Sequence, residues 1–232
     1  MNSIVYLVPC LLDDSALETI PHYIIDTVKN CQVIFAENER TARRFLKSIC
    51  KEIIIDDYEW FTIHKAEDEQ KNSFRQKVKE QKNIAIISEA GCPGIADPGQ
   101  ILIELAQQLN VAVKPLVGPS SILLALMASG MNGQQFEFVG YLPIDNGERI
   151  KTIKDLEDAS HIKRSTIIFI ETPYRNNQLI ETLLKTCKPS TRLCIAAELT
   201  GTNEFVKTKT IAEWQKEKTD FHKKPVIFLL LA

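Results

Sequence analysis

Glycines, prolines and two carboxylates are concentrated in one stretch, residues 88–99, which reads Ser-Glu-Ala-Gly-Cys-Pro-Gly-Ile-Ala-Asp-Pro-Gly. Glycine lets a backbone approach a ligand closely, and proline fixes the path of the chain. Glu89 and Asp97 place carboxylates within the same stretch. A strand-to-helix connection usually takes only about 2–6 residues. We therefore interpret 88–99 as a ligand-binding loop; the alternative is a tight turn in which Asp97 caps the next helix.

The residues on either side show how this loop is positioned. The apolar run 84–87 predicts a buried parallel strand at the centre of a sheet, and 101–106 predicts an amphipathic helix. In an open α/β sheet, ligands bind outside the carboxyl ends of the strands. The loop is therefore expected at the edge of the sheet where a ligand binds.

A second glycine-containing turn, Gly118-Pro119-Ser120-Ser121, follows a strand predicted at 111–116, which we expect next to the central strand. It opens a helix over 120–129 whose body is almost wholly apolar, so we expect that helix to be buried on most sides. Capping explains one serine. Two serine hydroxyls beside free helix N–H groups fit a ligand-binding helix terminus.

Charged residues also follow the strand predicted at 33–36. Glu37-Asn38-Glu39 leads into a helix over 40–49, with Asn38 as its N-cap. Positive side chains recur on one face of that helix at spacings of three and four: Arg40, Arg43, Arg44 and Lys47. The face is either simply solvated or turned toward the phosphates of a nucleic acid.

Composition bounds the class of protein. The 232 residues are 44% hydrophobic and 25% charged, as in a soluble globular protein of one large or two ordinary domains. A net charge of −2 does not indicate general nucleic-acid binding, although a local basic face is compatible with it. There is no apolar run of about 18 residues and no signal peptide, so we expect no membrane span and a cytoplasmic location. The six cysteines form no Cys-x-x-Cys pair, which predicts free thiols and no metal site.

The rest of the chain alternates strands and helices. A domain boundary is placed near Gly118, giving domains at 1–117 and 118–232. Further strands are predicted at 4–8, 53–55, 136–143, 165–170, 193–197, 205–210 and 226–231, and further helices opening at 20–25 and spanning 67–80, 152–159 and 175–187. The late strands are closely spaced, which predicts antiparallel pairing there.

Several blocks together resemble a known family. The stretch 88–99 is similar to a family motif that reads Ser-Asp-Ala-Gly-Thr-Pro, a variable residue, then Ile-Ser-Asp-Pro-Gly. Six further blocks resemble others of the family, at 36–40, 118–121, 128–130, 136–143, 171–175 and 198–200. The family is the tetrapyrrole methylase superfamily, in its ribosomal RNA small-subunit 2′-O-methyltransferase branch. The resemblance spans nearly the whole chain.

The resemblance implies an α/β protein of two domains, with S-adenosylmethionine in the cleft between them, and a homodimer. The N-terminal domain would hold a mostly parallel sheet with helices on both faces, and the C-terminal domain a mixed sheet with helices. No Gly-x-Gly-x-x-Gly follows a strand, so the cofactor would be bound by the family's own blocks. The cofactor-binding residues that the resemblance implies are Glu89, Ala90, Gly91, Ile95, Ala96, Ser120, Ser121, Leu142, Ala196 and Pro225.

Methyl transfer from a sulfonium is an in-line displacement that depends mainly on positioning. A 2′-hydroxyl acceptor also needs its proton removed, and four carboxylates at strand exits are candidate bases: Glu37, Glu39, Asp97 and Glu198. Each could instead be a helix cap or a surface carboxylate. Arg40 and Arg175 could hold a phosphate or neutralise an acid.

The chain departs from the family in its substrate loops. The first loop, 8–15, lacks the glycines of the family pattern, and Ala197 and Gly201 stand where the family has cations around Glu198. The acceptor is therefore open among ribosomal RNA or the small ribosomal subunit, and a tetrapyrrole or other small molecule. A third reading is a non-catalytic relative that binds cofactor or RNA.

Overall fold

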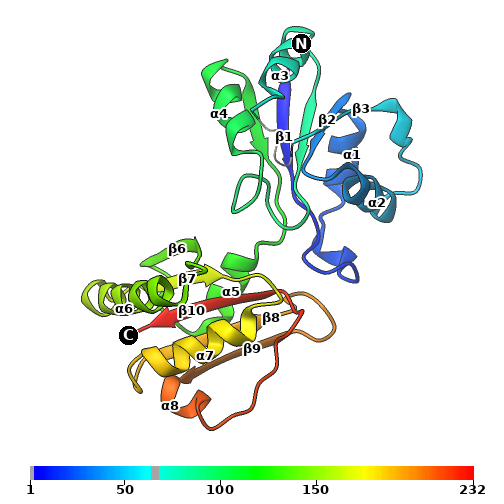
Figure 1. Cartoon of the computed structure of the whole chain (residues 1–232). Coiled ribbons are helices and arrows are strands. Elements are labelled where there is room, and N and C mark those ends of the chain that lie inside the picture. The colour runs from blue at the N-terminus through cyan, green and yellow to red at the C-terminus, as the bar shows by residue number, and fades with distance from the viewer. Residues whose placement is uncertain (1–2, 64–67) are drawn as a thin grey trace. The chain divides into compact units, whose positions relative to one another are not determined.

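The computed structural model describes residues 3–63 and 68–232 of the chain. The chain divides into two compact units, with the division between Ser120 and Ser121 (Figure 1). This position lies close to the boundary expected near Gly118. Each unit holds a five-stranded sheet of its own.

Unit 1 contains a wholly parallel sheet in the order β3-β2-β4-β1-β5. Its strands are β1 (Ile4–Val8), β2 (Val33–Ala36), β3 (Glu59–Thr62), β4 (Ile84–Ile87) and β5 (Ala112–Pro115). Both β2 and β4 are apolar at every position and buried throughout, as strands covered on both faces must be. The central position of β4 confirms the arrangement predicted from its apolar run.

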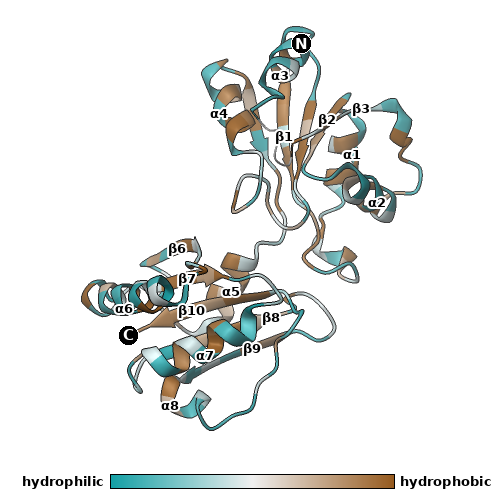
Figure 2. Ribbon diagram, viewed as in Figure 1, coloured by the Kyte–Doolittle hydropathy of each residue, from teal (hydrophilic) through white to brown (hydrophobic). Residues whose placement is uncertain are grey.

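The helices of unit 1 cover both faces of the sheet, as the resemblance implied. They are α1 (Tyr23–Lys29), α2 (Glu39–Ile49), α3 (Lys71–Lys79) and α4 (Gln100–Gln108), with short 3-10 helices η1 (Leu17–Thr19) and η2 (Ile55–Asp57). Buried residues of α1 and α2 form one apolar cluster and those of α3 and α4 form another, on opposite faces of the strands. Figure 2 shows the apolar residues gathered on the strands and polar residues on the outer helix faces.

Two predictions for unit 1 are wrong. The run 53–55 is not a strand, because Ile53 is buried in the core from a loop, Ile54 is 61% exposed and Ile55 begins η2. The third strand is β3, which pairs only with β2 at the sheet edge. In addition, β5 is not next to the central strand, since β1 lies between them. The helix predicted at 67–80 is α3, and its expected start at Glu67 lies outside the described residues.

Unit 2 contains a mixed sheet in the order β6-β7-β10-β8-β9. Only β6 and β7 pair in parallel, and the other neighbours are antiparallel, which confirms the prediction for the late strands. The strands are β6 (Phe136–Tyr141), β7 (Thr166–Ile170), β8 (Arg192–Ala197), β9 (Phe205–Thr210) and β10 (Val226–Leu231). The helices are α5 (Ser121–Ser129), α6 (Asn146–Lys163), α7 (Asn176–Thr186) and α8 (Ile211–Trp214).

The helix α5 is less buried than its composition predicted. Only Ala125, Leu126 and Ser129 are buried, while Leu123 is 52% and Met127 78% exposed. Within unit 2 the helix packs against β9 and β10, so one sheet covers one of its faces. The expectation that α5 is buried on most sides is therefore wrong within unit 2. Among the described helices, none has the length and apolarity needed to cross a membrane.

Candidate functional site

Three parallel strands of unit 1 end at the same sheet edge, and their exit loops are tied together there. The loop after β1 is joined to the loop after β4 by two backbone hydrogen bonds between Cys10 and Gly91, of 2.8 and 3.2 Å. The buried carboxylate of Glu37, which follows β2, accepts the backbone N–H of Glu89 at 2.9 Å. Glu37 thus holds the start of the 88–99 loop in place.

The loop 88–99 has a tightly turned backbone. Gly91 has a φ of +66°, and Ala96 adopts the same left-handed region with a φ of +63°, which is uncommon for alanine. Gly99, not Asp97, stands at the N-cap of α4 and offers it no side chain. The alternative in which Asp97 caps the helix is therefore wrong. Of the predicted cofactor residues here, Glu89, Ala90, Ile95 and Ala96 are exposed, and Gly91 is buried.

The second loop packs against the first within unit 1. A Cβ atom at Gly118 would lie 2.3 Å from the Cβ and Cγ atoms of Pro9, so no larger residue fits without displacing the proline ring. The thiol of Cys92 lies 3.6 Å from the carbonyl oxygen of Pro119. The turn at 118–119 is thereby fixed beside the 88–99 loop. Ser120 ends unit 1 and Ser121 begins unit 2, so the two predicted serines fall on either side of the division.

Three carboxylates lie near one another at this edge: Glu37, Glu89 and Asp97. Partial burial raises the pKa of Asp97 to about 6, and the negative charges of Glu37 and Glu89 act in the same direction. Burial, followed by the charges of Asp97 and Glu37, raises the pKa of the Cys10 thiol far above its ordinary value. At neutral pH Cys10 is therefore a neutral thiol, and Asp97 is mainly a carboxylate with a higher proton affinity than an ordinary aspartate, as a general base requires.

The helix α2 begins as its sequence predicted. The side chain of Asn38 accepts the backbone N–H groups of Arg40 and Thr41 at 3.0 and 3.3 Å, which confirms the N-cap. The predicted basic face is divided. Arg43 forms an ion pair of 2.6 Å with Glu39 and lies over the ring of Trp60, 5.0 Å from its centroid. Arg40 and Arg44 are exposed, and Arg44 lies 3.8 Å from the carboxylate of Asp14.

The candidate residues of unit 2 have different surroundings. Leu142 and Ala196 are buried in the core, whereas Pro225 is exposed and its carbonyl accepts the N–H of Glu198 at 3.0 Å. The carboxylate of Glu198 forms an ion pair of 2.6 Å with Lys224. Lys224 was not predicted, because it lies far from Glu198 in the sequence and only the antiparallel pairing of β8 with β10 brings the two together.

Arg175 is bound to an acid of its own unit. Its guanidinium donates to Oε1 of the buried Glu171 at 2.6 and 3.0 Å, and the backbone N–H of Thr172 donates to the same oxygen. Of the two predicted roles for Arg175, neutralising an acid is the one this contact provides. Glu171 was missed as its partner, although their spacing of four residues was visible in the sequence.

The structure brings the predicted residues together in two groups. One group lies at the carboxyl edge of the unit 1 sheet: Glu37, Glu39, Arg40, Glu89, Ala90, Gly91, Ile95, Ala96, Asp97 and Ser120. The other belongs to unit 2: Ser121, Leu142, Ala196, Glu198 and Pro225. A cofactor cleft formed by both groups stays a prediction.

Comparison with known proteins shows which family this chain resembles in sequence. Residues 16–215 match the model of the Tetrapyrrole (Corrin/Porphyrin) Methylases. The chain is 30% identical to "Ribosomal RNA small subunit methyltransferase I" of Buchnera aphidicola subsp. Schizaphis graminum, over 99% of this chain and 78% of that protein. The proteins of the same name from Vibrio cholerae and Bacillus subtilis are 28% and 30% identical, over 98% and 92% of this chain and 76% and 65% of theirs.

Solved structures show the same fold at low sequence identity. The methyltransferase CobJ aligns over 100% of this chain and 94% of its own with a TM-score of 0.64 and 14% identity. Uroporphyrin-III-C-methyltransferase from Thermus thermophilus aligns over 100% and 93% with a TM-score of 0.56 and 14% identity. These findings confirm the fold class and the resemblance. The chain belongs to the tetrapyrrole (corrin/porphyrin) methylases, a family of methyltransferases.

Proposed function

We propose that this protein transfers a methyl group from S-adenosylmethionine to the 2′-hydroxyl of a nucleotide in the RNA of the small ribosomal subunit, in the cytoplasm. The observation that carries the proposal is its similarity, over nearly the whole chain, to proteins named ribosomal RNA small subunit methyltransferase I. The site chemistry agrees, because it combines a turned glycine loop with three carboxylates, and burial raises the pKa of one of them, Asp97, to about 6.

The residues of the unit 1 edge fit the cofactor. A loop with a left-handed glycine, tied to Cys10 by two backbone hydrogen bonds, offers backbone groups at close range, and its exposed apolar side chains suit a flat ring. When bound, the cofactor supplies a methyl group on a sulfonium. The unit 1 residues that would hold it are Glu89, Ala90, Gly91, Ile95, Ala96 and Ser120. Ser121, Leu142, Ala196 and Pro225 would do so from unit 2.

Among the four candidate bases, Asp97 is the carboxylate best suited to accept the hydroxyl proton. Glu39 is paired with Arg43, Glu198 is paired with Lys224, and Glu37 accepts the N–H of Glu89. The oxygens of those three carboxylates are engaged by these partners, whereas the raised pKa of Asp97 favours proton uptake by that carboxylate. We assign Asp97 the removal of the hydroxyl proton and Glu37 the positioning of the loop.

The cofactor site is tested by Gly91→Val. Valine at a φ of +66° is strongly disfavoured, so the loop should change its path and S-adenosylmethionine binding should fall at least 100-fold in calorimetry. Gly133→Val is the matched control, since a Cβ at Gly133 meets nothing within 4 Å. Wild-type affinity in a folded Gly91→Val protein would remove this loop from the cofactor site.

The acceptor is tested by incorporation of tritiated methyl groups into small-subunit RNA and small subunits from cells that lack the protein. Incorporation into RNA, abolished by Gly91→Val, supports the proposal. Turnover on a tetrapyrrole or another small molecule but not on RNA would assign a different acceptor. Cofactor binding without turnover on any acceptor would indicate a non-catalytic relative.

We further propose that two copies of the chain associate. The motivating observation is the apolar surface of unit 2, where Leu123 and Met127 of α5 and Phe136 and Tyr141 of the edge strand β6 are exposed. An obligate homodimer should bury more than about 2,000 Å² of mainly apolar surface. Sedimentation at low micromolar concentration should therefore show a dimer. A single species near 26 kDa would contradict it, since such an interface does not dissociate at that concentration.

A further inference from the structure

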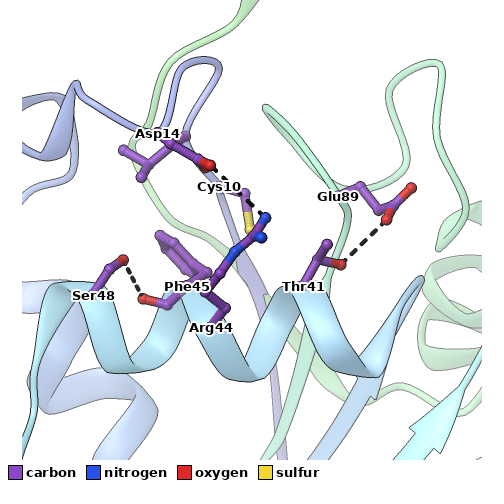
Figure 3. Close-up of a pocket in the computed structure, with 8 residues that line it drawn as sticks. Cys10, Asp14, Thr41, Arg44, Phe45, Ser48 and Glu89 are labelled. Atoms are coloured by element: carbon purple, nitrogen blue, oxygen red, sulfur yellow. Dashed lines mark hydrogen bonds and ion pairs between the residues drawn. The ribbon is translucent and has the colours of Figure 1, made fainter.

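A cavity of about 210 Å³ lies beside the 88–99 loop, where three segments of unit 1 meet (Figure 3). One wall comes from the loop after β1, through Cys10, Leu11 and Asp14. A second comes from one face of α2, where Thr41, Arg44, Phe45 and Ser48 recur at helical spacing. The third is Glu89. In the sequence, the only notable feature of the loop after β1 was that it lacks the glycines of the family pattern.

The floor and the rim of the cavity differ in polarity. Cys10, Leu11 and Phe45 are each more than nine-tenths buried and form an apolar floor. The rim carries both charges and a hydroxyl: the carboxylates of Asp14 and Glu89, the guanidinium of Arg44 and the side chain of Ser48. Asp14 and Arg44 are only loosely paired, at 3.8 Å, and both are largely exposed to solvent, so each can turn to a ligand.

The cavity is directly connected to the loop that we assign to the cofactor. Cys10 in its floor is bonded through its backbone to Gly91, and Glu89 in its wall receives the hydroxyl of Thr41 at 3.2 Å. A group bound in the cavity would therefore lie next to the 88–99 loop. An acceptor must lie next to the methyl donor, because the displacement needs the reacting atoms within about 3–3.5 Å of each other.

We propose that this cavity holds the base of one unpaired nucleotide of the acceptor RNA. The proposal rests on the proposed function and specifies its acceptor. Pockets for drug-sized ligands have about 300–1,000 Å³, so 210 Å³ suits a single ring system. A base needs an apolar surface for its faces and both donors and acceptors for its edge, and these are the groups of the floor and the rim. Enzymes that modify nucleic acid commonly move the target nucleotide out of its stack into such a pocket.

The same features disfavour a tetrapyrrole in this cavity. A macrocycle of four rings is too large for it, and its carboxylate arms would face the carboxylates of Asp14 and Glu89. The single cation of the rim, Arg44 among the residues that line it, cannot balance several acids. The cavity thus separates the two acceptor classes that the sequence left open.

The inference is tested first by binding, with no need for turnover. Each of the four ribonucleoside 5′-monophosphates is titrated into the protein and followed by the NMR signals of Leu11, Thr41 and Phe45. We expect at least one of them to shift these signals in a saturable way, and ribose 5-phosphate, which lacks a base, to leave Phe45 unchanged. If none of the monophosphates shifts them, or if ribose 5-phosphate gives the same shifts, the inference is overturned.

Two variants connect the cavity to activity. Ser48→Trp places a large side chain over the cavity from an exposed position of α2, and Arg44→Gln removes the rim cation. Each should lower nucleotide binding, and Ser48→Trp should lower kcat/KM for small-subunit RNA at least tenfold while S-adenosylmethionine affinity stays within twofold. Gln76→Trp, at an exposed position of α3 away from the cavity, is the matched control and should change neither.

The outcomes separate this inference from the proposed function. If Ser48→Trp, folded by its circular dichroism, methylates RNA at the wild-type rate, the cavity is not the acceptor pocket even though the function stands. If Ser48→Trp loses cofactor affinity to the same extent as activity, the cavity belongs to the cofactor and the inference is overturned. If the wild-type protein binds nucleotides in the cavity but methylates no RNA or ribosomal particle, the proposed function fails while nucleotide binding remains.

Discussion

The two sheets place their polar loops differently. In unit 1 all five strands are parallel, so the loops after β1, β2 and β4 leave one edge and meet there. In unit 2 the antiparallel neighbours of β10 send successive loops to opposite edges. Glu37 and Glu89 of unit 1 consequently lie near Asp97, whereas two carboxylates of unit 2 are each paired with a cation, Glu171 with Arg175 and Glu198 with Lys224.

This contrast indicates a division of labour. Like charges held together raise a pKa and store electrostatic strain, which a protein retains where chemistry needs it. Opposite charges in pairs hold a fold in place and leave little for catalysis. We therefore expect unit 1 to carry the reactive groups of the proposed function and unit 2 to carry a supporting surface. The predictions below test that contrast, from the largest expected effect to the smallest.

The largest difference is expected between two glycines. Gly118→Ala in unit 1 places a methyl group against the ring of Pro9 and should cost about 1–3 kcal/mol of unfolding free energy, with loss of cofactor binding. Gly133→Ala in unit 2 has open space and should stay within about 0.5 kcal/mol of the wild type. Urea unfolding and calorimetry measure both. Equal effects of the two substitutions would show that Gly118 is no more tightly packed than Gly133.

The next effect concerns RNA. Reversing Arg40 and Arg44 to Glu should weaken binding to small-subunit RNA by roughly 10–100-fold, because the phosphate contact expected of Arg40 and the rim cation Arg44 are both lost, and lower the salt slope by about 1. Cofactor affinity should not change. Lys151→Glu with Lys154→Glu, on the exposed face of α6, reverses the same charge in unit 2 and is the control. Filter binding at several salt concentrations distinguishes them, and equal losses would indicate a diffuse electrostatic effect.

The smallest effect is on stability and depends on pH. Asp97 binds a proton more tightly in the folded than in the unfolded chain, so its contribution to stability is present below pH 3.8 and is lost as the pH rises to about 6. Asp97→Asn should thus stabilise the protein at pH 7 by about 1 kcal/mol, after discounting for solvent exposure, and abolish methyl transfer. Thermal melts between pH 4 and 8, together with the methylation assay, check both.

The control for Asp97→Asn is Glu157→Gln in unit 2. Glu157 is buried and accepts the N–H of Lys188 and the hydroxyl of Thr191, so losing its charge should destabilise the protein by about 1–3 kcal/mol. Methyl transfer by the folded fraction should be retained. If instead Asp97→Asn lowers stability and leaves activity intact, Asp97 is a structural carboxylate and the assignment of the base is wrong.

Much of this organisation could be predicted from sequence because it depends on local pattern. The apolar runs at 33–36 and 84–87 are buried strands, Asn38 is an N-cap, and the glycine loop at 88–99 follows the central strand. The failures come from contacts between distant residues. Ile53 lies in a run of three isoleucines that is typical of a strand, but it belongs to a loop, and its side chain is buried in the core. Arg43 looks free until Trp60, on another element, covers it.

The residues of the candidate site could be predicted from the sequence, but the effect of their charges and burial on one another could not. The carboxylates at strand exits were visible as residue types at the ends of apolar runs. The raised pKa of Asp97 was not, since it depends first on the burial of that side chain and then on the charge of Glu37, which is distant in sequence and lies near Asp97 because β2 and β4 are neighbours. The cavity beside Cys10 likewise needs the backbone bridge to Gly91, which no pattern reveals.

The parallel sheet of unit 1 also has a consequence for how the chain emerges from the ribosome. The strand β1 pairs with β4 and β5 alone, and its partner for Ile4 is Ala112. At synthesis rates of about 5–20 residues per second, roughly 5–20 s separate the two. Until β4 is made, the apolar segment of β1 has no neighbour in the sheet, and non-local pairing of this kind is slow. Nascent unit 1 is therefore expected to depend on chaperones, whereas β8, β9 and β10 can pair within a few seconds of their synthesis.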